Sequence, residues 1–132
     1  MEVNQKLYGA AQELLAQHPD QAVSACYTED GQILTGVSTE SPHDQACLCA
    51  ETGPICEAQK LKKKIVASIC IAKEDKTGRV IVYTPCGICQ ERFFLFGEDL
   101  QVAIPQEDDP TKWQSVPLKQ AQPYWWKKAK LG

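Results

Sequence analysis

The chain has 132 residues, of which 43% are hydrophobic and 23% charged, and its net charge is −3. This length and composition predict one globular domain over residues 1–132. The acidic balance disfavours a phosphate-binding surface, so we expect no nucleic-acid partner. No segment approaches the roughly 18 apolar residues of a membrane-spanning helix, and the N-terminal residues do not resemble a signal peptide. We therefore predict a cytoplasmic protein with no membrane partner.

The first half of the chain predicts two helices with a hairpin between them. Leu7, Ala11 and Leu15 recur at helical spacing, and Pro19 follows the expected end of that helix. The residues Glu29-Asp30-Gly31 are a strong turn signal between two apolar runs. The predicted elements are a helix over 4–18, strands over 22–27 and 33–37, a loop over 38–45 and a helix over 49–62.

The second half predicts a buried strand and then alternating elements. Residues 65–72 form a continuous apolar run, which is typical of a central strand. The predicted elements that follow are a strand over 80–83, a helix from Pro85 through Leu95, a strand over 101–104, an acidic loop over 107–111, and a helical segment from Leu118 that contains Pro123. Helices interleaved with strands predict an α/β fold: a three-layer α/β/α sandwich around a mixed five-stranded sheet.

Seven cysteines are many for this length, and their number is odd. In a cytoplasmic chain, clustered cysteines indicate metal ligands or catalytic groups more often than disulfides. The clusters are Cys47 with Cys49 and Cys86 with Cys89, whereas Cys26, Cys56 and Cys70 are expected to be small core residues.

Cys49, Cys86 and Cys89 are predicted to bind one zinc ion. Both cysteine fragments are expected at the start of a helix, where free N–H groups and the helix dipole favour a thiolate. Three protein ligands leave a position for water, as catalytic zinc sites do, whereas structural sites have four ligands. Glu51 is poorly placed to bind the same ion but well placed to face that water, so we predict that it is the general acid/base.

The fragments Cys49-Ala50-Glu51 and Pro85-Cys86-Gly87-Ile88-Cys89 resemble the cytidine deaminase superfamily, whose pattern is His-or-Cys-x-Glu followed by Pro-Cys-x-x-Cys. Cysteine at the first ligand position resembles the small, tetrameric branch that acts on free nucleosides and includes the cytidine deaminases and blasticidin S deaminase. The resemblance implies a cytidine deaminase-like fold, a zinc cofactor, hydrolysis of a cytosine nucleoside to the uracil nucleoside, and a homotetramer, with a homodimer as the alternative.

The resemblance also implies roles for individual residues. Glu51 would protonate the ring nitrogen and then the leaving ammonia. The backbone of Ala50 would contact the carbonyl of the base, and the backbone carbonyl of Thr84 would accept from its amine. Glu40 and Ser38 occupy the positions that hold the ribose in nucleoside enzymes, where Ser38 replaces the usual Asn.

Several positions depart from the family pattern. The first strand usually reads Phe-x-Val-Gly-Ala, and here it reads Gln21-Ala22-Val23-Ser24-Ala25. An Arg is usual after the catalytic Glu or near the paired cysteines, where this chain has Thr52, Ile88 and Gln90. These changes keep two alternatives open: a deaminase for the antibiotic blasticidin S, and a catalytically inactive zinc-binding homologue.

Other interpretations concern the cysteines and the end of the chain. Cys47 or His43 could be a fourth ligand of a structural zinc site, and Cys86 with Cys89 could be a redox dithiol. An editing enzyme for RNA or DNA is disfavoured by the acidic charge. Trp125 and Trp126 are expected near the site, either closing the pocket over a base or packing against a neighbouring subunit.

Overall fold

The computed structural model describes residues 1–130, so residues 131 and 132 of the predicted domain lie outside the described range. Its elements, in chain order, are α1 (Gln5–Gln17), β1 (Val23–Thr28), β2 (Ile33–Val37), α2 (Thr52–Leu61), β3 (Ile65–Lys73), β4 (Val80–Val82), α3 (Gly87–Phe93), β5 (Gln101–Pro105), β6 (Trp113–Pro117) and α4 (Leu118–Ala121). Short 3₁₀ helices cover Asp44–Ala46, Phe94–Phe96 and Trp126–Lys130.

The sheet is mixed, as predicted. Its strand order is β2-β1-β3-β5-β6, and β4 pairs with β3 beside this path. The pairing of β3 with β5 is parallel, and the other pairings are antiparallel. The predicted α/β fold class is therefore confirmed, with six strands in place of the five predicted.

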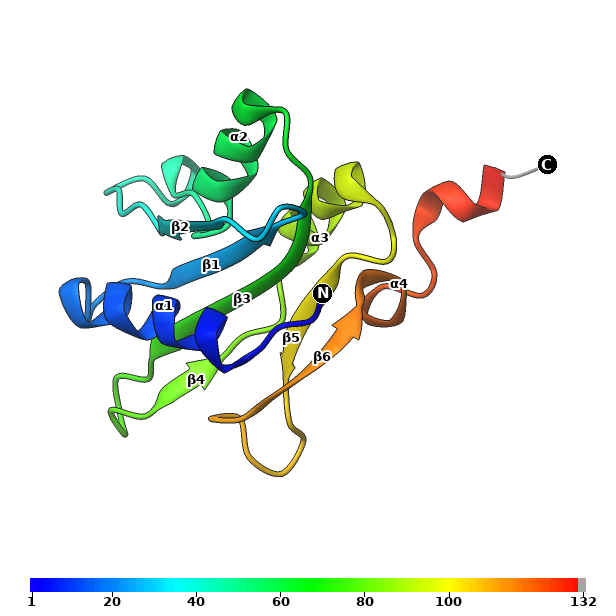
Figure 1. The fold of residues 1–132 in the computed structure, drawn as a ribbon. Helices are drawn as coiled ribbons and strands as arrows, with labels where there is room; N and C mark the ends of the chain where they lie inside the picture. Colours follow the sequence, from blue (N-terminus) through cyan, green and yellow to red (C-terminus); the bar gives the residue numbers. More distant parts are fainter. Residues whose placement is uncertain (131–132) are drawn as a thin grey trace.

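Helices cover both faces of the sheet, as Figure 1 shows for α1 on one side and α2 on the other. Alternate side chains of β1 explain this arrangement, because successive residues of a strand point to opposite faces. Val23, Ala25 and Tyr27 pack with the buried face of α1, whereas Cys26 packs with residues of α2 and α3. Both faces of the central strands are thus buried, which gives the three predicted layers.

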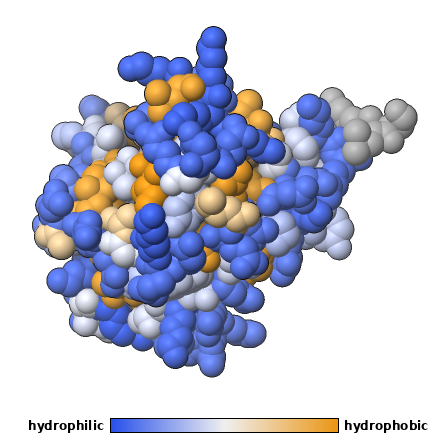
Figure 2. Space-filling model, in the orientation of Figure 1, coloured by the Kyte–Doolittle hydropathy of each residue, from blue (hydrophilic) through white to orange (hydrophobic). Residues whose placement is uncertain are grey.

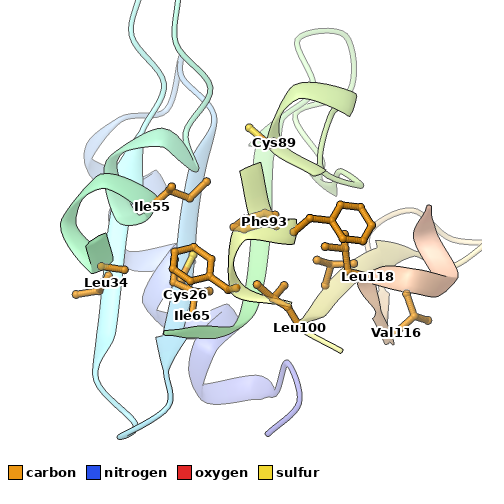
Figure 3. Packing of buried hydrophobic residues seen from close by; sticks show 13 residues of the cluster. Cys26, Leu34, Ile55, Ile65, Cys89, Phe93, Leu100, Val116 and Leu118 are labelled. Carbon is orange, nitrogen blue, oxygen red and sulfur yellow. The ribbon is translucent and has the colours of Figure 1, made fainter. Parts of the chain in front are cut away.

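The layer that carries α2 and α3 is built around Phe93. Figure 3 shows this ring in the middle of the cluster, with Ile55 of α2 on one side and Leu118 on the other. Phe93 is fully buried. The buried apolar side chains of α3 therefore hold the helix against the sheet.

On the face of the molecule drawn in Figure 2, most residues are hydrophilic, and hydrophobic atoms form smaller patches.

Three sequence predictions were wrong in this part of the molecule. The sixth strand, β6, was not predicted, because the short segment Trp113–Pro117 becomes a strand only by pairing with β5. The C-terminal helix does not contain Pro123 but ends at Ala121, in keeping with the bias against helix before proline. Cys56 is exposed rather than in the core, because α2 buries Pro54, Ile55 and Ala58 instead. Cys26 and Cys70 are buried, as predicted.

Among residues 1–130, no helix has the length and apolar character needed to cross a membrane.

The turn between β1 and β2 allows a test of the fold by pH. The Thr28 hydroxyl donates to Asp30, and Lys63 Nζ lies 2.9 Å from Asp30 Oδ2. These two partners lower the pKa of Asp30 from 3.8 to about 2. A carboxyl group whose pKa is lower in the folded state stabilises the fold at pH values above its unfolded pKa. This contribution is lost as the pH falls through its folded pKa.

We therefore expect Asp30→Asn to be less stable than wild type at pH 7, with the difference shrinking as the pH falls from about 4 toward 2. Urea denaturation at several pH values measures this difference. A difference that stays constant over that range would contradict the assigned role of the carboxylate.

Candidate metal and catalytic site

Three cysteine sulfurs meet where α2 and α3 begin. Cys49 lies just before α2, Cys86 is the N-cap of α3, and Cys89 is in the first turn of α3. The three Sγ atoms lie within 4.8 Å of one another, and those of Cys49 and Cys86 are 3.4 Å apart. Zinc–sulfur bonds of about 2.3 Å at tetrahedral angles separate ligand sulfurs by roughly 3.8 Å. The cluster therefore fits zinc in both donor type and size.

The packing of α3 orients the two cysteines that it carries. Cys89 precedes Phe93 by one helical turn, so both side chains lie on the buried face of the helix (Figure 3). Cys89 is fully buried, Cys49 is partly buried and Cys86 is exposed. An ion held by these sulfurs would thus be anchored in the core and reachable from the side of Cys86.

The surroundings of the three thiols differ. Burial disfavours the thiolate of Cys86, but the backbone N–H of Cys89 and the thiol of Cys49 outweigh it, and the pKa of Cys86 is lowered. Burial raises the pKa of Cys49, and the neighbouring Cys86 raises it further. Burial also raises the pKa of Cys89, together with the charge of Glu51. A cation at the centre would relieve these opposing effects, because it favours all three thiolates.

Glu51 lies in a turn that ends at the start of α2. The Thr52 N–H donates to the Cys49 carbonyl at 3.1 Å and closes this turn. Glu51 is only 3% exposed, and this burial raises the pKa of its carboxyl. Its own backbone N–H and the thiol of Cys70 partly oppose the rise. A raised pKa suits a group that takes up a proton and returns it.

Two residues that sequence reasoning did not select hold this turn against the sheet. The buried hydroxyl of Ser24 donates to the Ala50 carbonyl at 2.9 Å. Gly36 of β2 faces the same carbonyl so closely that a Cβ on it would lie 2.3 Å from the Ala50 oxygen and 2.5 Å from Pro54 Cδ. The sequence signal that could have identified Ser24 is its position in the first strand, where the family pattern has Gly.

The structure brings the predicted substrate-binding residues together only in part. Ala50 is buried in the Cys49–Thr52 turn. The segment that contains Glu40 is joined to the residue before Cys49, because the Thr39 N–H donates to the Leu48 carbonyl at 3.0 Å. Glu40 is exposed, and so is Thr84, which lies between β4 and Cys86.

Ser38 is placed differently from the other predicted substrate-binding residues. Its hydroxyl accepts the Ala22 N–H at 3.1 Å, and its carbonyl accepts from Gln21 Nε2 at 2.7 Å. The side chain of Ser38 is therefore bound to the chain itself, at the beginning of β1.

The candidates for a fourth ligand do not join the cluster. Cys47 is exposed, and its thiol lies 3.9 Å and 3.8 Å from the carbonyl oxygens of Ser41 and His43. The metal-binding group found within residues 1–130 contains three cysteines, without Cys47 or His43. Cys49 also contacts Cys86 closely, so Cys86 and Cys89 are not an isolated redox pair.

A guanidinium that the sequence pattern did not indicate reaches the start of α2. Arg92 Nη1 donates to the Thr52 hydroxyl at 3.1 Å, next to Glu51 in the chain. Arg92 is in the last turn of α3, so the motif positions at Thr52, Ile88 and Gln90 gave no signal for it. It links α3 to the first residue of α2, just after the turn that carries Cys49.

The C-terminal tryptophans lie against α3. Trp125 stacks on Phe94 with ring centres 4.0 Å apart, and the indole N–H groups of Trp125 and Trp126 donate to Glu91 at 2.5 Å and 2.6 Å. Both indoles line a hollow of about 420 Å³ that Gly87 also lines. Gly87 lies between the two ligand cysteines of α3, so this aromatic segment adjoins the cluster.

Comparison with known proteins places this geometry in a family. Residues 1–104 match the model of the cytidine and deoxycytidylate deaminase zinc-binding region. The chain belongs to this family. The predicted resemblance is thus confirmed, and family membership supports a deaminase activity.

Solved structures of cytidine deaminases are similar over most of the chain. The enzyme from Bacillus anthracis matches with a TM-score of 0.85 and 38% identity, covering 96% of this chain and 91% of that chain. The enzyme from Mycobacterium leprae matches with a TM-score of 0.69 and 26% identity, covering 92% of this chain and 98% of that chain. The comparison with curated proteins gave no match.

The contact of Gly36 with the turn predicts a clear effect of one added methyl group. Gly36→Ala must displace backbone at Ala50 or the ring of Pro54, at a cost of about 1–3 kcal/mol in stability. We expect weaker zinc binding as well, because Cys49 belongs to the displaced turn. Thermal unfolding and competition with a zinc chelator measure the two effects.

Gly53→Ala is the matched control. A Cβ on Gly53 would lie 3.8 Å from Gly36 Cα, which is ordinary contact, and the residue is helical. We expect this variant to bind zinc normally and to gain about 0.5–1 kcal/mol in stability. Equal effects of the two substitutions would contradict the tight approach at Gly36.

Proposed function

We propose that this protein is a zinc-dependent hydrolytic deaminase that converts cytidine or deoxycytidine to the uracil nucleoside and ammonia. The observation that carries the proposal is the buried carboxyl group of Glu51 beside a cluster that, within residues 1–130, contains three thiols and no fourth ligand. Three ligands are typical of catalytic zinc, and a carboxyl group with a raised pKa is typical of a proton carrier. Family membership supports both assignments.

In this proposal Cys49, Cys86 and Cys89 hold the zinc ion. Such a site supplies Lewis-acid activation of a water molecule at its open position. The chain contributes the electrostatic conditions: the N–H groups of Cys89 and Ile88 stabilise a thiolate at Cys86, and the core around Cys89 fixes the ligands. Because these three ligands are fixed, the open coordination position of the ion would always face the same direction.

Glu51 moves the protons of the reaction. Its carboxylate accepts the proton of the attacking water and delivers it to the ring nitrogen, and then a proton to the leaving ammonia. Because Glu51 is almost fully buried, bulk water does not compete for that proton. The resemblance supplies the remaining contacts: the Ala50 backbone and the Thr84 carbonyl to the base, and Glu40 to the ribose.

Ser38 favours a second candidate substrate, the antibiotic blasticidin S. Its hydroxyl accepts the Ala22 N–H, and its short side chain lacks the amide group with which the usual Asn binds the ribose. Both candidate substrates present a cytosine ring to the zinc, and they differ in the attached sugar. Loss of a sugar contact therefore changes the choice of substrate while the reaction stays the same.

We also propose a homotetramer, with a homodimer as the alternative. Tyr124 is 91% exposed and Trp126 is 57% exposed, which are large aromatic surfaces to leave in water. They line a hollow with Gly87, which lies next to Cys86 in the chain, so a neighbouring subunit packed on them would lie near the proposed site.

The proposed reaction can be measured directly with zinc-loaded protein. Zinc-loaded protein should release ammonia from cytidine, deoxycytidine or blasticidin S, followed by the change in ultraviolet absorbance, and should contain one zinc ion per chain. Removal of zinc with a chelator should abolish turnover, and added zinc should restore it. Stoichiometric zinc with no turnover of any of the three would favour the inactive homologue.

The role of Glu51 as the proton carrier can be tested by removing its acidic group. Glu51→Gln keeps the size of the side chain and removes its ability to carry a proton, so zinc content should remain and kcat should fall by about a hundredfold or more. Glu57→Gln makes the same change on the exposed face of α2 and should leave kcat unchanged. Full activity of Glu51→Gln would show that another group carries the proton.

A further inference from the structure

Four buried polar side chains lie on the face of β1 and β3 that carries α2 and α3. Ser24 pairs with Cys70 across the two strands, and Cys26 pairs with Ser68. Their exposed fractions range from 0% to 9%. Polar groups in a core cost stability unless they have partners, so each of these pairs calls for an explanation.

The two pairs have different partners. Cys26 donates to Ser68 Oγ at 3.3 Å, so this pair satisfies itself. Ser24 and Cys70 instead reach upward to the turn before α2. Ser24 Oγ donates to the Ala50 carbonyl at 2.9 Å, and Cys70, its cross-strand partner on the same face, lowers the pKa of the Glu51 carboxyl against the effect of burial.

We propose that Ser24 and Cys70 are positioning residues that hold Glu51 in the orientation needed for proton transfer. The Ala50 carbonyl and the Glu51 N–H belong to one peptide group, so the bond from Ser24 fixes the backbone of Glu51. Cys70, opposite Ser24 on β3, acts at the other end of the same residue, its carboxyl group. This inference rests on the proposed function, in which Glu51 carries the protons.

The chemistry of each partner suits this role. Burial raises the pKa of Cys70, so its thiol keeps its proton and is able to donate to a neighbouring carboxylate. Gly36, the cross-strand partner of Ser24 on β2, has no side chain and so leaves room for the Ala50 carbonyl to approach the sheet. Ser24 stands where the family pattern has Gly, which has no side chain to donate, so the backbone contact is a feature of this chain.

The experiment compares the two pairs in zinc-loaded protein. Ser24→Ala and Cys70→Ala should each lower kcat for the nucleoside that the wild type accepts by about tenfold, the rate equivalent of one hydrogen bond, with KM nearly unchanged. Cys70→Ser keeps a donor and should restore most of kcat. Ser68→Ala, the matched control, removes a similarly buried hydroxyl that does not contact the turn, and should leave kcat unchanged.

A second readout does not depend on activity. Amide hydrogen exchange measured by NMR should be about tenfold faster at Glu51 and Thr52 in Ser24→Ala than in wild type, and unchanged there in Ser68→Ala. Equal kcat and equal exchange in Ser24→Ala, Cys70→Ala and Ser68→Ala would overturn the proposal. If zinc-loaded wild type turns over no nucleoside, the proposed function fails, and the exchange rates alone decide whether Ser24 and Cys70 hold the turn.

Discussion

The close approach of the turn before α2 to the sheet is the constraint on which the site depends. At Gly36 the backbone of β2 comes so near the Ala50 carbonyl that no side chain fits between them, and Ser24, the partner of Gly36 on β1, donates to the same oxygen. Because the turn carries both Cys49 and Glu51, its position sets where a metal ligand and a carboxylate lie relative to α3. In the proposed reaction, a looser contact would separate groups that act on the same water molecule.

The second half of the site depends on a different contact, the burial of one face of α3. Phe93 occupies the centre of its core layer, and Cys89 lies one turn earlier on the same face. The apolar core therefore delivers a thiol to a place where thiolates are disfavoured. Together with the buried Glu51, this stores an electrostatic cost that a bound cation offsets. Metal binding and correct folding are coupled for that reason.

The departures from the family pattern have different consequences in three dimensions. Ser24 adds a hydrogen bond beneath the catalytic turn, whereas Ser38 turns its hydroxyl away to the start of β1. The motif positions lack the usual Arg, and Arg92, from the far end of α3, donates to Thr52 at the start of α2. The departures from the family pattern thus change the surroundings of the cysteine cluster and leave the three thiols and Glu51 in place.

The sequence by itself determined the α/β class, most element positions, the family and the three clustered cysteines, because hydrophobic periodicity and short motifs are local properties of the chain. It missed β6, whose strand conformation depends on pairing with β5, and it misplaced Cys56, since only packing decides which side of α2 is buried. The tertiary structure alone decided that Ser24, Gly36, Cys70 and Arg92 surround the catalytic turn. These residues are distant in sequence, and a contact between distant residues leaves no local pattern to read.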